Sequence, residues 1–254
     1  SGRYACRDFG QNYLASIPEE GNPIIFTCGD NDTFPLWYNQ EVEGVRTDAR
    51  VCNLSYLQTD WYIDQMRRPA YDSPSIPIKW ERIDYAGNAN EDIEIRPEIK
   101  DYIKSVYAEN PEGAKKRFGE NPFELKNIMK NWVCSRNEKL HYIPTDTVYI
   151  EIDKEAVIRS GMIIPVEYAD TMPRYMKISL SGHKKITRSN LMLLEMLSQC
   201  NWERPLYMSM TVGEENYLGS LKNFFVHEGL AYRITPFNWV ELGYSNSNDI
   251  VVDT

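Results

Sequence analysis

The chain has 254 residues, of which 42% are hydrophobic and 26% are charged, and its formal net charge at pH 7 is -9. This length and hydrophobic content suffice for one large domain with a hydrophobic core. The excess of acidic residues argues against nucleic acid as a partner, because binding to phosphate backbones is driven by Lys and Arg. No stretch approaches the roughly 18 apolar residues of a membrane-spanning helix, so the sequence predicts a soluble body.

The first third of the chain predicts two successive strand–turn–helix units. They are a strand over 24–28, a helix over 34–43, a strand over 50–55 and a helix over 61–68. In the first helix, Phe34, Tyr38 and Val42 recur at every fourth position, which predicts that they share a buried face. Pro69 ends the second helix. Two strands joined by one helix should lie parallel, with a right-handed crossover.

The remainder of the chain divides into an irregular part and a regular part. Residues 71–147 predict a mostly helical insertion, with short strands at 76–80 and 93–95 and helices at 97–108 and 122–133. After it we expect strands at 147–152, 175–180, 204–210 and 229–234 and helices at 154–159, 189–200 and 215–227. This alternation favours a single α/β domain over 1–254, with a mostly parallel, Rossmann-like sheet covered by helices on both faces.

The sequence lacks the motifs of several common metal, nucleotide-binding and catalytic sites. The five cysteines are scattered without a zinc-site spacing, so neither a structural metal nor a disulfide framework is indicated. The chain lacks G-x-G-x-x-G after a strand, the phosphate-binding G-x-x-x-x-G-K-[ST], the G-x-S-x-G elbow and H-E-x-x-H. Its three histidines lie far apart in sequence, which favours surface or packing roles over a catalytic base.

The loop after the first predicted strand carries the first candidate site, Asp30-Asn31-Asp32-Thr33. Two carboxylates at this spacing can hold Mg²⁺ or Mn²⁺ and thereby a nucleotide-sugar diphosphate, because hard cations prefer oxygen ligands. The structural alternative is favoured. In it, Asp32 or Thr33 caps the following helix and Asp30 ties the turn to its own backbone.

A second group of polar and aromatic residues follows neighbouring strands. It consists of Trp37, Asp60, Trp61, Asp64 and Glu214. If the strands are adjacent and parallel, these side chains share one crevice with Asp30, because ligands bind beyond the carboxyl ends of such strands. An acidic crevice with exposed rings suits a saccharide or a cation better than an anion. The alternative is that both tryptophans only fill the interface between sheet and helices.

Several segments resemble a known family. GDNDTFPLWY at 29–38 and TDWYIDQM at 59–66, together with 40–44, 46–48, RPLY at 204–207 and EGLAYR at 228–233, are similar to a family of large bacterial membrane proteins of unknown function related to protein O-mannosyltransferases. The resemblance implies that this chain is the extracytoplasmic (periplasmic) part that follows a set of transmembrane helices. It also implies that catalysis belongs to a loop between those helices and that the sugar donor is lipid-linked.

Three hypotheses about function follow. The first is an accessory or recognition domain of a membrane glycosyltransferase-like protein, which binds a saccharide or an acceptor polypeptide, is not catalytic alone and uses no cofactor. Its partner would be the transmembrane region of its own full-length protein. The second is a free-standing, metal-dependent glycosyltransferase built on Asp30 and Asp32. The third is a structural or oligomerisation domain without a ligand.

Overall fold

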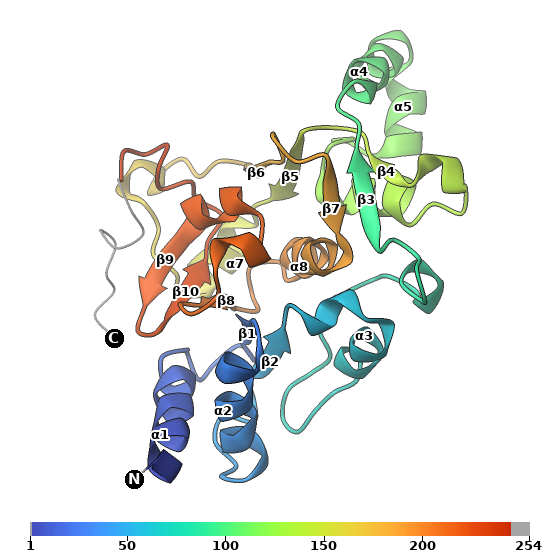
Figure 1. Ribbon diagram of the computed structural model, residues 1–254. Coiled ribbons are helices and arrows are strands. Elements are labelled where there is room, and N and C mark those ends of the chain that lie inside the picture. Colours follow the sequence, from blue (N-terminus) through green and yellow to red (C-terminus); the bar gives the residue numbers. More distant parts are fainter. Residues whose placement is uncertain (1, 245–254) are drawn as a thin grey trace.

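Helices and short strands alternate along most of the chain (Figure 1). The computed structural model describes residues 2–244. Its helices are α1 (Gly2–Ala15), α2 (Asp30–Glu41), α3 (Asp60–Met66), α4 (Ile99–Glu109), α5 (Pro111–Phe118), α6 (Leu125–Ile128), α7 (Lys154–Arg159) and α8 (Arg188–Gln199). Its strands are β1 (Ile24–Thr27), β2 (Arg50–Asn53), β3 (Asp92–Ile95), β4 (Tyr142–Ile143), β5 (Thr147–Glu151), β6 (Tyr175–Ser179), β7 (Lys185–Thr187), β8 (Leu206–Ser209), β9 (Phe225–Glu228) and β10 (Ala231–Ile234).

The central sheet has five strands in the order β2-β1-β8-β10-β9. Strand β1 runs parallel to β2 and to β8, as expected for units joined by helical crossovers. Strand β10 runs antiparallel to β8 and to β9. The fold is therefore α/β with a mixed sheet, and the Rossmann-like parallel arrangement is limited to the part made by β2, β1 and β8.

The helix predicted over 215–227 is wrong, and this error explains the antiparallel side of the sheet. Glu214–Asn216 and Gly219–Phe224 form short 3-10 turns, and the chain then extends into β9. A tight turn at Gly229, where φ is +59°, returns the chain into β10. Glycine adopts this left-handed conformation without steric penalty. Pairing with β10 thus stabilises an extended backbone where a helix was expected.

The two faces of the central sheet bury different side chains. Ile25, Val51 and Tyr207 belong to one cluster with α1 and α2, whereas Phe26 and Cys52 belong to the main core with α8. Neighbouring residues of a strand point to opposite faces, so this alternation means that helices cover both sides of the sheet. Helices on both faces were expected from the sequence. In Figure 1, α1 and α2 lie side by side at the end of the molecule opposite α4 and α5.

Helix α8 is the centre of the main core. Its residues from Leu191 to Leu197 are all buried, including the carboxylate-bearing Glu195. A helix that is apolar on nearly every side must be enclosed by other elements, and Figure 1 shows α8 between the central sheet and the smaller sheets.

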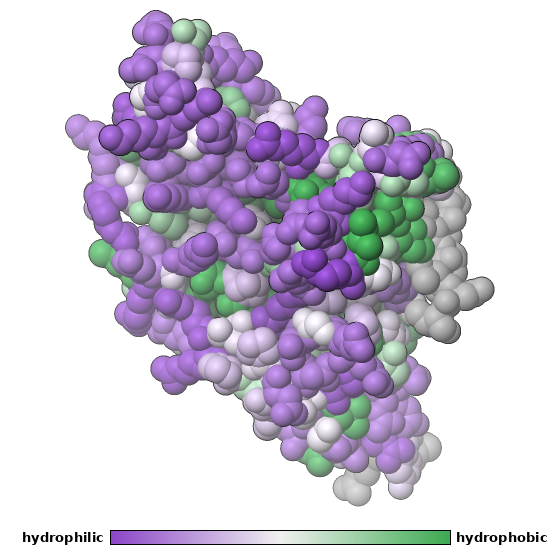
Figure 2. Space-filling view, turned by 180° about the vertical axis from the view of Figure 1, so that it is seen from behind, coloured by the Kyte–Doolittle hydropathy of each residue, from purple (hydrophilic) through white to green (hydrophobic). Residues whose placement is uncertain are grey.

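No helix within residues 2–244 combines the length and apolar character needed to span a membrane. The face seen in Figure 2 is mainly hydrophilic, with hydrophobic residues gathered in small areas.

The insertion is less helical than the sequence suggests. It contributes β3 and β4 to a three-stranded sheet, β4-β3-β7, while β5 and β6 form a separate pair. Residues 76–80 are irregular, and the helix expected over 122–133 is the single turn α6 followed by a π-helical turn, Met129–Val133. A small core of its own holds this part together: Ile103, Phe118, Phe123, Trp132 and Tyr142.

Candidate functional site

The carboxyl ends of the parallel strands meet at one edge of the central sheet. Thr27, the last residue of β1, lies opposite Asn53, the last residue of β2. Helix α2 begins at Asp30, directly beyond β1, and α3 begins at Asp60, a short 3-10 turn beyond β2. In open α/β sheets this edge is where ligands bind, because its loops are free of packing constraints.

A buried hydrogen-bond network connects β1, β2 and the start of α2 beneath the surface of this edge. The Thr33 hydroxyl bonds to the Thr27 hydroxyl at 2.8 Å and donates to the Gly29 carbonyl oxygen, also at 2.8 Å. Asn53 donates from Nδ2 to the same Thr33 oxygen at 3.0 Å. Thr33 is fully buried. It therefore positions α2 on the two strands rather than facing the surface as a binding residue.

The prediction that Asp32 or Thr33 caps α2 is wrong. The helix starts four residues earlier than expected, and its N-cap is Gly29, whose φ is +81°. Among residues 2–244, no side chain accepts a capping hydrogen bond at this end. Asp30 and Asp32 instead occupy the first turn, where negative charge is favoured by the helix dipole.

The predicted buried face of α2 is also wrong. Phe34, Tyr38 and Val42 are all exposed, whereas Asn39 and Gln40 are buried. The Asn39 side-chain amide donates to the Arg7 and Pro35 carbonyl oxygens, and that of Gln40 donates to the Arg46 and Ala49 carbonyl oxygens. Buried polar groups are tolerated when they are hydrogen-bonded. The helix can therefore turn its apolar residues outward.

This orientation places a row of aromatic rings along the sheet edge. We define the aromatic edge as Phe34, Trp37, Tyr56 and Trp61. Successive ring centroids are 5.8, 6.3 and 5.8 Å apart. Phe34 is 49% exposed and Trp61 is 55% exposed, while Trp37 and Tyr56 are half-buried. Trp61 thus does not fill the interface between sheet and helices.

Tyr56 links the aromatic edge to the predicted acidic loop, and sequence reasoning missed it. Its hydroxyl donates to Oδ1 of Asp30 at 3.1 Å, and this bond is the main reason why the pKa of Tyr56 is raised. Asn31 is exposed and Asp32 is half-buried beside it. The signal that could have identified Tyr56 is its place just after β2, the same rule that identified Asp30 after β1.

Trp37 also lines a groove next to the aromatic edge. The groove lies between α2 and α3, has a volume of about 190 Å³, and is lined in part by Tyr62, Gln65 and Val51. The Tyr62 hydroxyl bonds to the backbone N–H of Asn53 at 2.9 Å, which fixes this wall of the groove to β2. The aromatic edge is thus continuous with this groove through Trp37.

Asp60 and Asp64 serve mainly to hold a neighbouring loop. Asp60 accepts a hydrogen bond from the backbone N–H of Gly87 at 3.0 Å. Asp64 accepts from the Tyr85 hydroxyl at 2.7 Å and pairs with Arg82 at 3.1 Å. The Gly87 N–H lowers the pKa of Asp60, and the Tyr85 hydroxyl lowers that of Asp64. These carboxylates remain ionised at neutral pH and fix the 82–87 loop to α3.

The role of Tyr85 yields a prediction about titration. Tyr85→Phe is expected to raise the pKa of Asp64, because it removes the largest of the interactions that lower it. The folded-state pKa of Asp64 lies below its unfolded value, so its stabilising effect is present above the unfolded pKa and is lost as pH falls through the folded pKa. The measurement is a carbon-13 NMR titration of the side-chain carboxyl groups. The exposed Tyr102→Phe change serves as the control, and an unchanged Asp64 midpoint in Tyr85→Phe would contradict the assignment.

Glu214 lies beyond β8 and pairs with Lys222 at 3.0 Å, with both side chains half exposed or more. Its neighbour Glu215 helps to line a polar hollow of about 280 Å³ with Ser55 and Asn190.

The structure thus brings Asp30, Trp37 and Trp61 together, ties Asp60 and Asp64 to a loop, and pairs Glu214 with a lysine. Within residues 2–244, no three His, Cys, Asp or Glu side chains are grouped as metal ligands would be.

Fold and site together define a class of protein: a mixed α/β domain that presents exposed aromatic rings and carboxylates at the carboxyl edge of its parallel strands. A family model described as TMEM260-associated domain 2 matches residues 6–253, and the chain belongs to this family. Neither the curated proteins nor the solved structures include a significant match.

Proposed function

We propose that this chain is the extracytoplasmic recognition domain of a membrane glycosyltransferase-like protein related to protein O-mannosyltransferases. Its role is to hold a saccharide or acceptor polypeptide at the aromatic edge, while sugar transfer is performed elsewhere in the full-length protein. The family match supports the link to a membrane protein concerned with O-mannosylation. The sequence resemblance supports the extracytoplasmic position and the transmembrane partner.

The observation that carries the proposal is the exposed aromatic edge. Rings with one face in water and one face on the protein can stack on the apolar face of a sugar or on aliphatic and proline side chains of a peptide. Trp61 is the most exposed ring of the row. Asp30 and Asn31 lie at the start of α2, where they can accept hydrogen bonds from sugar hydroxyls or peptide N–H groups.

The proposal predicts that Trp61→Ala weakens ligand binding about tenfold, because stacking on one ring contributes roughly 1 kcal/mol or more. The purified domain is titrated with oligomannosides in one series and with Ser/Thr-rich acceptor peptides in another, and binding is followed by calorimetry. Tyr102→Ala is the matched control, because Tyr102 is similarly exposed but lies on α4. Equal binding by wild type and Trp61→Ala would remove the aromatic edge from the function.

Thermal unfolding in the presence of metal separates the recognition role from the metal-dependent alternative. If Asp30 and Asp32 held Mg²⁺ or Mn²⁺, millimolar metal would raise the melting temperature, because a ligand that binds only the folded state stabilises it. An Asp30→Asn/Asp32→Asn variant would abolish that increase. A metal-dependent increase that is lost in this variant would favour a transferase site over the recognition role proposed here.

A further inference from the structure

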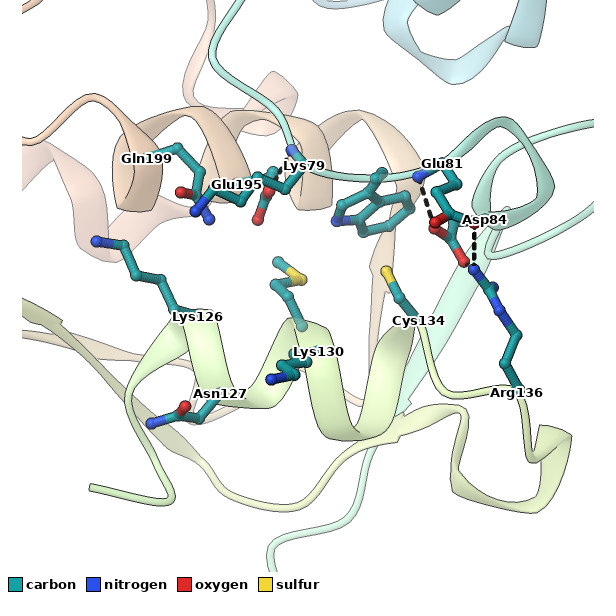
Figure 3. A pocket seen from close by; sticks show the side chains of 12 residues that line it. Lys79, Glu81, Asp84, Lys126, Asn127, Lys130, Cys134, Arg136, Glu195 and Gln199 are labelled. Carbon is teal, nitrogen blue, oxygen red and sulfur yellow. Dashed lines mark hydrogen bonds and ion pairs between the residues drawn. The ribbon is translucent and has the colours of Figure 1, made fainter. Parts of the chain in front are cut away.

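A second pocket lies between α8 and the helical turns at 126–134 (Figure 3). Its volume is about 310 Å³. In Figure 3, Glu195 and Gln199 extend from α8, Lys126 and Asn127 extend from the helical turns opposite, and Lys79 belongs to the segment that crosses above them. No residue of the aromatic edge is among those that line it. The size is at the lower end for small-molecule pockets, which are roughly 300–1,000 Å³.

Two deeply buried polar groups in this pocket are incompletely paired. Glu195 is 1% exposed, and its Oε1 accepts a hydrogen bond from the backbone N–H of Lys79 at 2.9 Å. Its Oε2 makes no hydrogen bond of ordinary geometry within residues 2–244, although the side-chain amide of Gln199, one helical turn away, is close enough to favour the ionised carboxylate. Trp80 is 2% exposed, and its indole N–H is likewise unpaired within the described part of the chain. Buried polar atoms in native proteins are nearly always paired, so this acceptor and this donor are the atoms of the pocket to which a bound molecule would form hydrogen bonds.

Three exposed lysines flank these two groups. Lys79, Lys126 and Lys130 line the pocket and form no ion pair with any carboxylate in the part of the chain that the structure describes. Arg136, at the other end, differs because it pairs with Glu81 at 2.7 Å and with Asp84 at 2.6 Å. Three unpaired lysines in a chain of net charge -9 form a local anion-attracting field.

We propose that this pocket binds a small hydroxylated anion, a monosaccharide that carries a phosphate or carboxylate group. Sugar hydroxyls both donate and accept hydrogen bonds, so they can donate to Oε2 of Glu195 and accept from the indole N–H of Trp80. The anionic group lies at the lysines. The pocket volume suits a single sugar unit rather than a chain.

The test uses the purified protein and four probes: a hexose 6-phosphate, a hexuronate, the neutral hexose and inorganic phosphate. Binding is followed by nitrogen-15 NMR at the Trp80 indole N–H, a signal assigned by its loss in Trp80→Phe. One or both hydroxylated anions are expected to shift this signal and to bind at least about tenfold more tightly than the neutral hexose or phosphate alone. Comparison of the two anions identifies phosphate or carboxylate as the preferred group.

Two variants separate the parts of the site. Lys126→Ala/Lys130→Ala is expected to weaken binding of the anionic sugar about tenfold and to leave the neutral hexose unaffected, because it removes charge only. Glu195→Gln is expected to weaken every hydroxylated probe, because it replaces an oxygen acceptor. The exposed Lys177→Ala change, on β6, is the control.

Three outcomes would overturn the proposal: no shift of the Trp80 signal with any probe at millimolar concentration, equal binding of inorganic phosphate and hexose phosphate, or unchanged binding in the double-lysine variant. The first and third apply even if Glu195→Gln fails to fold. None of these outcomes concerns the aromatic edge, so failure of the pocket proposal would not affect the proposed recognition function.

Discussion

Replacing Arg188 with leucine is expected to lower the free energy of unfolding by about 3–5 kcal/mol. Arg188 is 2% exposed, and its guanidinium donates to the carbonyl oxygens of Gln58, Gly87 and Ala89 at distances between 2.6 and 3.2 Å. Leucine would leave these three partly buried acceptors without their donor. Each such loss costs roughly 1–3 kcal/mol, part of which local relaxation recovers.

The effect should reach the aromatic edge, because Arg188 holds the loop that binds Asp60, the neighbour of Trp61. Gly87 offers its carbonyl oxygen to Arg188 and its N–H to Asp60. Urea unfolding followed by circular dichroism measures the change, with the midpoint expected to fall at constant m. Arg188→Lys should recover part of the lost free energy of unfolding, because lysine keeps the positive charge but lacks the planar guanidinium group that donates to several acceptors at once. The exposed Arg68→Leu change is the control, and equal stabilities of Arg188→Leu and Arg68→Leu would contradict the assignment.

Leu194→Ala is expected to destabilise the protein by about 2–5 kcal/mol. Leu194 is fully buried at the centre of α8 and belongs to the main core. The change removes apolar atoms and leaves a cavity that the surrounding helices and sheets can fill only in part, because α8 is enclosed on all sides. The lower half of this range would indicate that the neighbouring side chains relax into the space.

A matched control for this prediction is Ile158→Ala. Ile158 has the same number of carbon atoms as leucine but is 55% exposed on α7, so its loss should change stability by no more than about 0.5 kcal/mol. Both variants are compared by urea unfolding. If Leu194→Ala were as stable as Ile158→Ala, the central packing of α8 described here would be incorrect.

The first two strand–turn–helix units show how far local sequence information reaches. Strands β1 and β2 and helices α2 and α3 lie close to their expected positions, because each is specified by a short apolar run with turn or helix signals beside it. Their parallel pairing follows from the connecting helix. The sequence was therefore sufficient to bring Asp30 and Trp61 to one edge of the sheet.

The faces of α2 show where that information ends. The spacing of Phe34, Tyr38 and Val42 indicated a buried stripe, but these side chains point outward. The buried side of the helix is decided by carbonyl oxygens at Arg7 and Arg46, which only the folded chain brings to Asn39 and Gln40. The spacing of apolar residues does not show which polar side chains will find hydrogen-bond partners in the folded chain.

The sequence by itself determined the α/β class, the sheet edge that carries the candidate site and the absence of the common catalytic motifs, because each depends on residues close together in the chain. Only the tertiary structure decided the antiparallel hairpin of β9 and β10, the roles of Asp60 and Asp64, and the pocket around Glu195. These features depend on contacts between residues far apart in sequence. Glu195 meets the Lys79 backbone, for example, across 116 positions. Such contacts gain their free energy only when the whole core forms, so no local pattern can specify them.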